Sequence, residues 1–248
     1  MLLAVDIGNS NTKFCIFDSE QLLSKFSLPT CSELAADELK SLIGGDVSIT
    51  NAIVCSVVPE KEQSLKDELQ QAFGIEALSI SNDLDFGLKI NYQPRSAIGT
   101  DRLVNSFAAV EKYGTPCIVC SIGTATTFDV VNHNRELLGG IIAPGMKTMA
   151  KALHLNTAKL PEIDIEKPEN ILGNTTVGSI QSGIFYGHVA MVEGVIQKIR
   201  KEIGDDPKAV ATGGFASLIA ENTAVIDLVD ENLLLDGLRL LHERLQPE

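Results

Sequence analysis

Positive charge is scarce in this sequence. Its 248 residues include 20 Lys and Arg against 33 Asp and Glu, so the formal net charge at pH 7 is -13. Recognition of nucleic acids and anionic lipids depends on clustered Lys and Arg that attract phosphate. We therefore expect neither nucleic acid nor a membrane surface among the partners of this chain.

Long apolar runs and targeting signals are also missing. The chain passes from Met1 through a short apolar segment to Asp6, without a basic region, a cleavage site or an apolar run of about 18 residues. Its 44% of apolar residues are enough for a sizeable core. We expect a compact, soluble, cytoplasmic protein.

Cysteine is sparse and odd in number, which argues against a disulfide framework. The five residues are Cys15, Cys31, Cys55, Cys117 and Cys120, and most of them lie in apolar runs. Cys117 and Cys120 have the spacing of a redox motif, but a reactive thiolate is favoured at a helix start rather than inside an apolar run. Buried free thiols in a reducing compartment are the expected state.

Apolar runs bounded by Gly, Asn and Asp predict strands. These runs cover residues 2–8, 11–18, 51–58, 116–122, 125–131, 136–143 and 208–212. Predicted helices run from a Ser32 cap to about Ile43, from Pro59 to Gly74, and from a Thr100 cap to about Gly114. A longer helix over 176–203 has one broad apolar face, suited to packing on a sheet or on a second subunit.

The common phosphate-binding motifs are absent: there is no G-x-x-x-x-G-K-[ST] loop and no complete G-x-G-x-x-G. An internal repeat takes their place. Residues 5–14 and 120–128 each consist of an apolar strand, a Gly turn, small hydroxyl or amide residues and a second strand. This pattern predicts two related lobes, each beginning with a hairpin whose N–H groups and hydroxyls can hold phosphate.

The first hairpin has the groups that a magnesium–nucleotide complex needs. Asp6 can bind Mg²⁺ directly or through water, and Lys13 can contact the transferred phosphate. Since Gly8-Asn9 is a common turn pair, an ordinary β-turn is the alternative. The repeat favours phosphate binding.

A third segment, Thr212-Gly213-Gly214, follows a short strand and precedes a predicted helix. Paired glycines allow a nucleotide to approach the backbone near a helix N-terminus, although a tight strand-to-helix turn would look the same. Two phosphate hairpins followed by a late Gly-Gly turn match the order in actin/hexokinase-like (ribonuclease H-like) ATPases. The predicted fold class is therefore α/β, with lobes at 1–112 and 113–248 and an ATP cleft between them.

The segment 98–102 lies between the two hairpins. It places Asp101 and Arg102 side by side at a helix start, where an acid is favoured by the helix dipole and Arg can bind an anionic or hydroxylated substrate. A plain helix start with an exposed ion pair is the alternative. Its position between two phosphate loops favours a base and a substrate clamp.

Taken together, these segments resemble type III pantothenate kinase, the bacterial enzyme of the first step of coenzyme A synthesis. The resemblance covers nearly the whole chain, and several separate motifs follow in the same order. The matching segments are residues 6–13, Tyr92, 99–102, 123–126, 139–145, 157–161 and 212–214.

The resemblance implies ATP-dependent phosphorylation of pantothenate to 4'-phosphopantothenate by a homodimer, with Asp101 as the base and Mg²⁺ as cofactor. The implied ATP-binding residues are Asp6, Ile7, Gly8, Asn9, Ser10, Asn11, Thr12, Lys13 and Thr124, to which the Gly-Gly turn adds Gly213 and Gly214. The implied pantothenate contacts are Tyr92, Gly99, Thr100, Asp101, Arg102 and Thr176.

One position departs from the family pattern. The family has Asp just ahead of the second hairpin, where it holds a monovalent cation such as K⁺ or NH₄⁺; this chain has Ser121. A neutral hydroxyl is a far weaker ligand for a hard cation. Asp129 is expected to lie well away from Ser121, so we expect cation dependence to be weak.

Two other functions compete with this one. The first is a kinase or phosphohydrolase of the same fold acting on a sugar or acetate, against which the pairing of Tyr92 with residues 99–102 argues. The second is a catalytically weakened regulatory protein, which Ser121 favours and the retained Asp6 and Asp101 oppose.

Overall fold

The structure, a computed structural model, describes residues 1–44 and 47–246. The chain forms two compact α/β units: Met1–Lys112 with Asn232–Glu248 (unit 1), and Tyr113–Glu231 (unit 2). The sequence led us to expect lobes at 1–112 and 113–248. The C-terminal segment differs, because its helix packs on strands of unit 1 instead of joining the second lobe.

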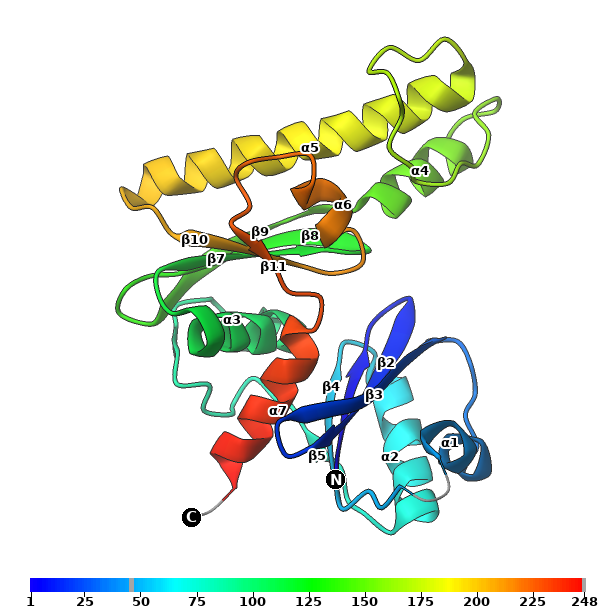
Figure 1. The fold of residues 1–248 in the computed structure, drawn as a ribbon, viewed down its shortest axis with the longest axis vertical. Helices are drawn as coiled ribbons and strands as arrows, with labels where there is room; N and C mark the ends of the chain where they lie inside the picture. The colour runs from blue at the N-terminus through cyan, green and yellow to red at the C-terminus, as the bar shows by residue number, and fades with distance from the viewer. Residues whose placement is uncertain (45–46, 247–248) are drawn as a thin grey trace. The chain divides into compact units, whose positions relative to one another are not determined.

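Unit 1 is built on a sheet with strand order β3-β2-β1-β4-β5 (Figure 1). β1 pairs antiparallel with β2 and parallel with β4. The strands are β1 (Leu2–Ile7), β2 (Asn11–Asp18), β3 (Gln21–Pro29), β4 (Asn51–Ser56) and β5 (Leu78–Ser79), with a short β6 (Lys89–Ile90) further on. The helices are α1 (Ala36–Ile43), α2 (Pro59–Phe73), the 3₁₀ turn η1 (Arg95–Ala97), α3 (Thr100–Tyr113) and α7 (Leu233–Leu245).

The two faces of this sheet have different roles. Leu3, Val5 and Ile7 of β1 point into a core shared with α1 and α2. Because side chains alternate along a strand, Asp6 points to the opposite face, the side on which α7 packs against β1 and β4. A carboxylate is thereby placed on a covered face of the sheet.

Unit 2 repeats the plan with strand order β11-β10-β7-β8-β9 among its own strands. β7 pairs antiparallel with β8 and parallel with β10. The strands are β7 (Cys117–Ile122), β8 (Ala125–Val131), β9 (Glu136–Pro144), β10 (Lys208–Thr212) and β11 (Leu228–Val229). The helices are α4 (Met146–Leu155), α5 (Thr176–Ile203) and α6 (Ala216–Ala220).

The long helix α5 lies along one face of the unit 2 sheet (Figure 1). Its buried residues, among them Ile184, Val192 and Ile196, share a core with Ile118 and Phe128 of the sheet. The predicted bounds of this helix and its packing on a sheet are confirmed. Since the sheet already covers this apolar face, the face gives no support to a dimer.

The other predicted elements are largely confirmed. All seven predicted strands are present, and Pro59 begins α2 while Gly74 ends it in the left-handed conformation. Two predicted caps are wrong. α1 begins at Ala36, where the Glu38 carboxylate accepts the Ala35 N–H, so Ser32 lies outside the helix, and Thr100 is already inside α3.

The cysteines are free and, except for the exposed Cys31, buried. Burial raises the pKa of the Cys15, Cys117 and Cys120 thiols to about 12, which keeps them protonated. The predicted packing role of Cys117 and Cys120 is confirmed. Within residues 1–44 and 47–246, no helix is long and apolar enough to cross a membrane.

Candidate active site

The first hairpin is held in shape by the neighbouring strand. The Gly8 N–H donates to the Asn11 carbonyl at 3.1 Å and closes the turn. Thr30, directly after β3, donates its hydroxyl to the Gly8 carbonyl at 2.7 Å and its N–H to the Ser10 carbonyl at 3.0 Å. The turn at Asn9 is exposed. A fixed turn with exposed backbone and amide groups is suited to binding an anion.

The residues predicted as one ATP-binding run fall on two faces of the hairpin. Asp6 pairs in register with Lys13 and shares its face, whereas Thr12 pairs with Ile7. The Thr12 hydroxyl lies 3.2 Å from that of Thr30, and both residues line a pocket of about 460 Å³. The acid and the cation are thus adjacent, while Thr12 supports the hairpin from the other side.

Asp6 is a carboxylate whose pKa is strongly raised by its surroundings. It is 8% exposed, and burial raises its pKa from 3.8 to about 6, with Lys13 opposing the rise and Asp101 adding to it. The Lys13 ammonium lies 3.6 Å from the nearer carboxylate oxygen. Burial makes the ionised form of Asp6 unfavourable, and a bound cation would stabilise that form. The site therefore fits Mg²⁺, bound directly or through water.

Asp101 lies in the first turn of α3, in the same unit as Asp6. Burial raises its pKa, and the backbone N–H and charge of Arg102 oppose the rise. The charge of Asp101 contributes to the raised pKa of Asp6, so the two carboxylates lie within electrostatic reach of each other. A base beside a candidate magnesium ligand is the arrangement that phosphoryl transfer to a hydroxyl requires.

Arg102 and Tyr92, predicted as substrate contacts, meet in the structure. The Arg102 guanidinium carbon lies 5.2 Å from the centre of the Tyr92 ring, and Arg102 is 5% exposed. Stacking on an aromatic ring orients the planar guanidinium without using all of its hydrogen-bond donors. The predicted group Tyr92, Gly99, Thr100, Asp101 and Arg102 thus lies within one unit.

The second hairpin, between β7 and β8, is braced by the start of α4. The Thr124 carbonyl accepts the Gly145 N–H at 3.0 Å and the Thr148 hydroxyl at 2.7 Å. A side chain at position 145 would overlap the Gly123 carbonyl oxygen, so this close approach requires glycine. On the core side, the Thr126 hydroxyl lies 3.0 Å from His188 Nε2 of α5.

The Gly-Gly turn packs directly on the second hairpin. Gly213 has a φ of +95°, and a Cβ there would lie 2.6 Å from the Ile122 carbonyl oxygen. The same oxygen accepts the Phe215 N–H at 3.2 Å. The structure therefore brings Thr124, Gly213 and Gly214 into one region of unit 2.

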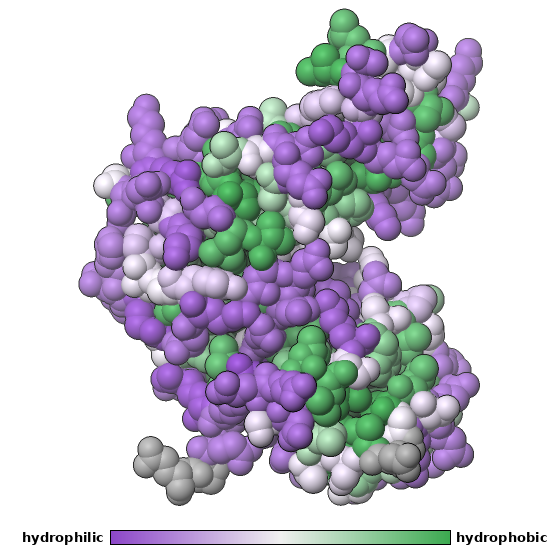
Figure 2. Space-filling model, viewed as in Figure 1, coloured by the Kyte–Doolittle hydropathy of each residue, from purple (hydrophilic) through white to green (hydrophobic). Residues whose placement is uncertain are grey.

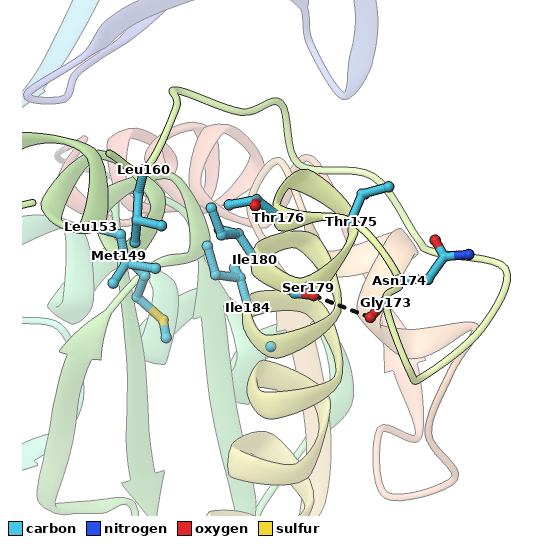
Figure 3. A pocket seen from close by; sticks show the side chains of 11 residues that line it. Met149, Leu153, Leu160, Gly173, Asn174, Thr175, Thr176, Ser179, Ile180 and Ile184 are labelled. Carbon is cyan, nitrogen blue, oxygen red and sulfur yellow. Dashed lines mark hydrogen bonds between the residues drawn. The ribbon is translucent and has the colours of Figure 1, made fainter. Parts of the chain in front are cut away.

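Thr176 lies elsewhere in unit 2, at the first residue of α5, and lines a pocket of about 830 Å³ (Figure 3). The hydroxyl of Thr175 caps the helix by accepting the Gly178 N–H at 3.0 Å. Met149, Leu153 and Leu160 face Ile180 and Ile184 across the pocket, whose rim carries hydroxyl groups. The pocket can hold a ligand with both apolar and polar parts.

Ser121 lies on a rung of hydroxyl residues. It pairs in register with Thr127 of β8 and Thr212 of β10, so this rung has no carboxylate. Asp129 is closer than the sequence indicated: it pairs with Val119, and so lies one diagonal step from Ser121 on the same face, about 7–8 Å away. The rung itself does not fit a carboxylate-bound monovalent cation.

Within residues 1–44 and 47–246, no group of three or more His, Cys, Asp or Glu side chains could hold a metal by itself. Mg²⁺ usually binds one or two carboxylates together with substrate phosphates and water. Asp6 fits that pattern.

The model of the family described as type III pantothenate kinase matches residues 2–198. The chain belongs to the type III pantothenate kinase family. A type III pantothenate kinase from Brevibacillus brevis (strain 47 / JCM 6285 / NBRC 100599) is 41% identical over 254 residues, which cover 99% of this chain and 100% of the relative.

Solved structures confirm the actin/hexokinase-like fold of this family member. A conserved Campylobacter jejuni protein, named after the Baf family of transcriptional activators, has a TM-score of 0.62 at 20% identity and 98% coverage of both chains. The ethanolamine utilization protein EutJ from Carboxydothermus hydrogenoformans has a TM-score of 0.54 at 15% identity, covering 96% of this chain and 89% of the other.

Three residues of this pantothenate kinase family member escaped prediction. Thr30 holds the first hairpin, Cys55 contacts Thr100, and His188 contacts Thr126. Thr30 follows a strand whose apolar pattern is short and mostly exposed, and Cys55 and His188 resemble ordinary core residues. Only the pairing of distant segments reveals their contacts.

Proposed function

We propose that this protein transfers the terminal phosphate of ATP to the hydroxyl of pantothenate, giving 4'-phosphopantothenate for coenzyme A synthesis. The observation that carries the proposal is that Asp101 and the stacked Arg102–Tyr92 pair lie in the same unit as the buried Asp6, within electrostatic reach of it. Family membership supports the choice of pantothenate as acceptor.

In this reaction Asp101 removes the proton from the pantothenate hydroxyl, whose oxygen then attacks the terminal phosphorus while ADP leaves. Asp6 would hold Mg²⁺, which would supply neutralisation of the phosphate charge. Lys13 and the donors of the first hairpin orient the phosphates, and Arg102 binds the pantothenate carboxylate. Thr124 with Gly213 and Gly214 contacts ATP, and Tyr92, Gly99 and Thr176 contact pantothenate.

We further propose that the protein is a homodimer. Large apolar side chains are exposed where the α4–α5 loop and the adjoining helix ends lie, and Figure 2 shows hydrophobic surface at this end of unit 2. They are Leu153, Leu155, Ile171, Leu172 and Val177. Exposed apolar patches of this kind are typical of protein interfaces.

The buried free thiols support action in the reducing cytoplasm.

An acceptor panel tests the proposed activity. ADP release is measured with Mg·ATP and, in separate reactions, pantothenate, N-acetylglucosamine, acetate or no acceptor. We expect ADP release only in the reaction that contains pantothenate. Turnover with the sugar or acetate instead would assign a different kinase, and no turnover with any acceptor, despite nucleotide binding, would support the regulatory alternative.

A further inference from the structure

Cys55 and Thr100 form a hydrogen-bond chain beside the proposed base. The buried Cys55 Sγ donates to Thr100 Oγ1 at 3.4 Å, and Thr100 Oγ1 donates to the Ser56 carbonyl at 3.2 Å. The chain runs in one direction, from thiol to hydroxyl to carbonyl. It ties the first residue of α3 to the end of β4.

The hydrogen-bond chain from Cys55 through Thr100 to Ser56 connects the surroundings of Asp6 with those of Asp101. Cys55 pairs in register with Asp6 in the parallel β1–β4 ladder, so the two side chains share a face of the sheet. Thr100 immediately precedes Asp101. Cys55 and Thr100 thus connect the sheet face that carries Asp6 to the first turn of α3, which carries Asp101.

We propose that Thr100 is a positioning residue for Asp101, with Cys55 as its support, rather than a contact to the acceptor. The single proton of the Thr100 hydroxyl is directed to the Ser56 carbonyl, which leaves it no donor for a substrate. This inference rests on the proposed role of Asp101. The hydrogen bonds of Thr100 hold the first turn of α3 against the repulsion between the Asp6 and Asp101 carboxylates.

The test is a double-mutant cycle between Thr100→Val and Asp101→Asn. Valine keeps the shape of threonine and removes both hydrogen bonds. Because a displacement of about 1 Å in a catalytic group can slow turnover about 100-fold, we expect Thr100→Val to lower kcat on the order of 10 to 100-fold with the KM for ATP nearly unchanged. In the Asp101→Asn background the same change should alter kcat less than about 2-fold.

Conservative variants separate positioning from stability. Thr100→Ser keeps the hydroxyl and Cys55→Ser keeps a donor, so both should stay within about 3-fold of the wild-type kcat, whereas Cys55→Ala removes the donor and should lose more than about 3-fold. Thr223→Val is the matched control: it removes a hydroxyl that bonds Glu193 at 2.8 Å in unit 2 and should leave kcat unchanged. A Thr100→Val variant as active as wild type, or one whose loss adds fully to that of Asp101→Asn, would overturn the proposal.

A second measurement does not depend on turnover. The pKa of Asp101 is followed through its carboxyl carbon resonance in the ligand-free protein, assigned by its disappearance in Asp101→Asn. In Thr100→Val we expect this pKa to fall towards its ordinary value, because a released first turn is better solvated. If wild type failed to phosphorylate pantothenate but this pKa moved, the proposed function would fail and the positioning role would stand. An unchanged pKa in Thr100→Val would contradict the positioning role.

Discussion

Replacing Asp6 with Asn should make the ligand-free protein more stable while abolishing its activity. Asn has the size of Asp without the buried charge. The carboxyl pKa rises from 3.8 to about 6 on folding, a shift of about two units at 1.36 kcal/mol each, or about 3 kcal/mol. Lys13 loses its partner in the variant, but its side chain is 40% exposed and hydrated, so the loss is small. We expect a net gain of about 1–3 kcal/mol at pH 7.

The gain has a definite pH dependence. The folded pKa of Asp6 is raised, so the folded protein binds more protons than the unfolded chain between pH 3.8 and about 6. The stability contributed by protonated Asp6 is therefore complete below pH 3.8 and is lost as the pH rises through about 6. Asp6→Asn does not titrate, so its advantage should be near zero at pH 4 and largest above about pH 6.5.

Thermal unfolding of wild type and Asp6→Asn between pH 4 and 8 measures this difference. For a chain of this length, 1–3 kcal/mol corresponds to an increase in Tm of roughly 2–12 °C at pH 7. Mg·ATP should raise the Tm of wild type more than that of the variant. A variant that is less stable than wild type at pH 7, or a difference independent of pH, would refute the reasoning.

Three further predictions concern catalysis, cation use and assembly. Asp101→Asn should slow turnover on the order of 100 to 10,000-fold, the usual effect of losing a general base, and near-normal turnover would exclude that role. Because Ser121 provides no charge, turnover in Tris or sodium buffer should nearly equal turnover in potassium, and Ser121→Asp should create potassium dependence; strong potassium activation of the wild type would contradict this. Light scattering at micromolar concentration should show a dimer, and a fully active monomer would rule out a required dimer.

Much of the fold could be predicted because its signals are local. Each of the two hairpins is a Gly turn between two apolar runs, and α2 has Pro at its start and Gly at its end. β3 was missed because its apolar alternation is short: Phe26 and Leu28 pack on the core, while most of its other side chains are exposed. The place of α7 in unit 1 depends on contacts with β1 and β4, more than 170 residues away, and no local pattern encodes them.

The residues of the candidate site differ in how strong their local sequence signal is. Asp6, Lys13 and Asp101 belong to contiguous motifs, so their residue types and spacing were enough to select them. The contact between Cys55 and Thr100 depends on the β1–β4 register and on where α3 begins. The position of Asp129 relative to Ser121 likewise follows from the β7–β8 register, which residue spacing alone did not reveal.

The most direct test of the central claim is the stoichiometry of one reaction. Purified protein is incubated with Mg·ATP and pantothenate, and ADP, remaining pantothenate and the phosphorylated product are quantified together by mass spectrometry and ³¹P NMR. We predict one ADP for each pantothenate consumed, with the phosphate esterified to its primary hydroxyl, and no product from Asp6→Asn. ADP formation that proceeds equally without pantothenate, or a product that carries no phosphate ester, would contradict the assignment.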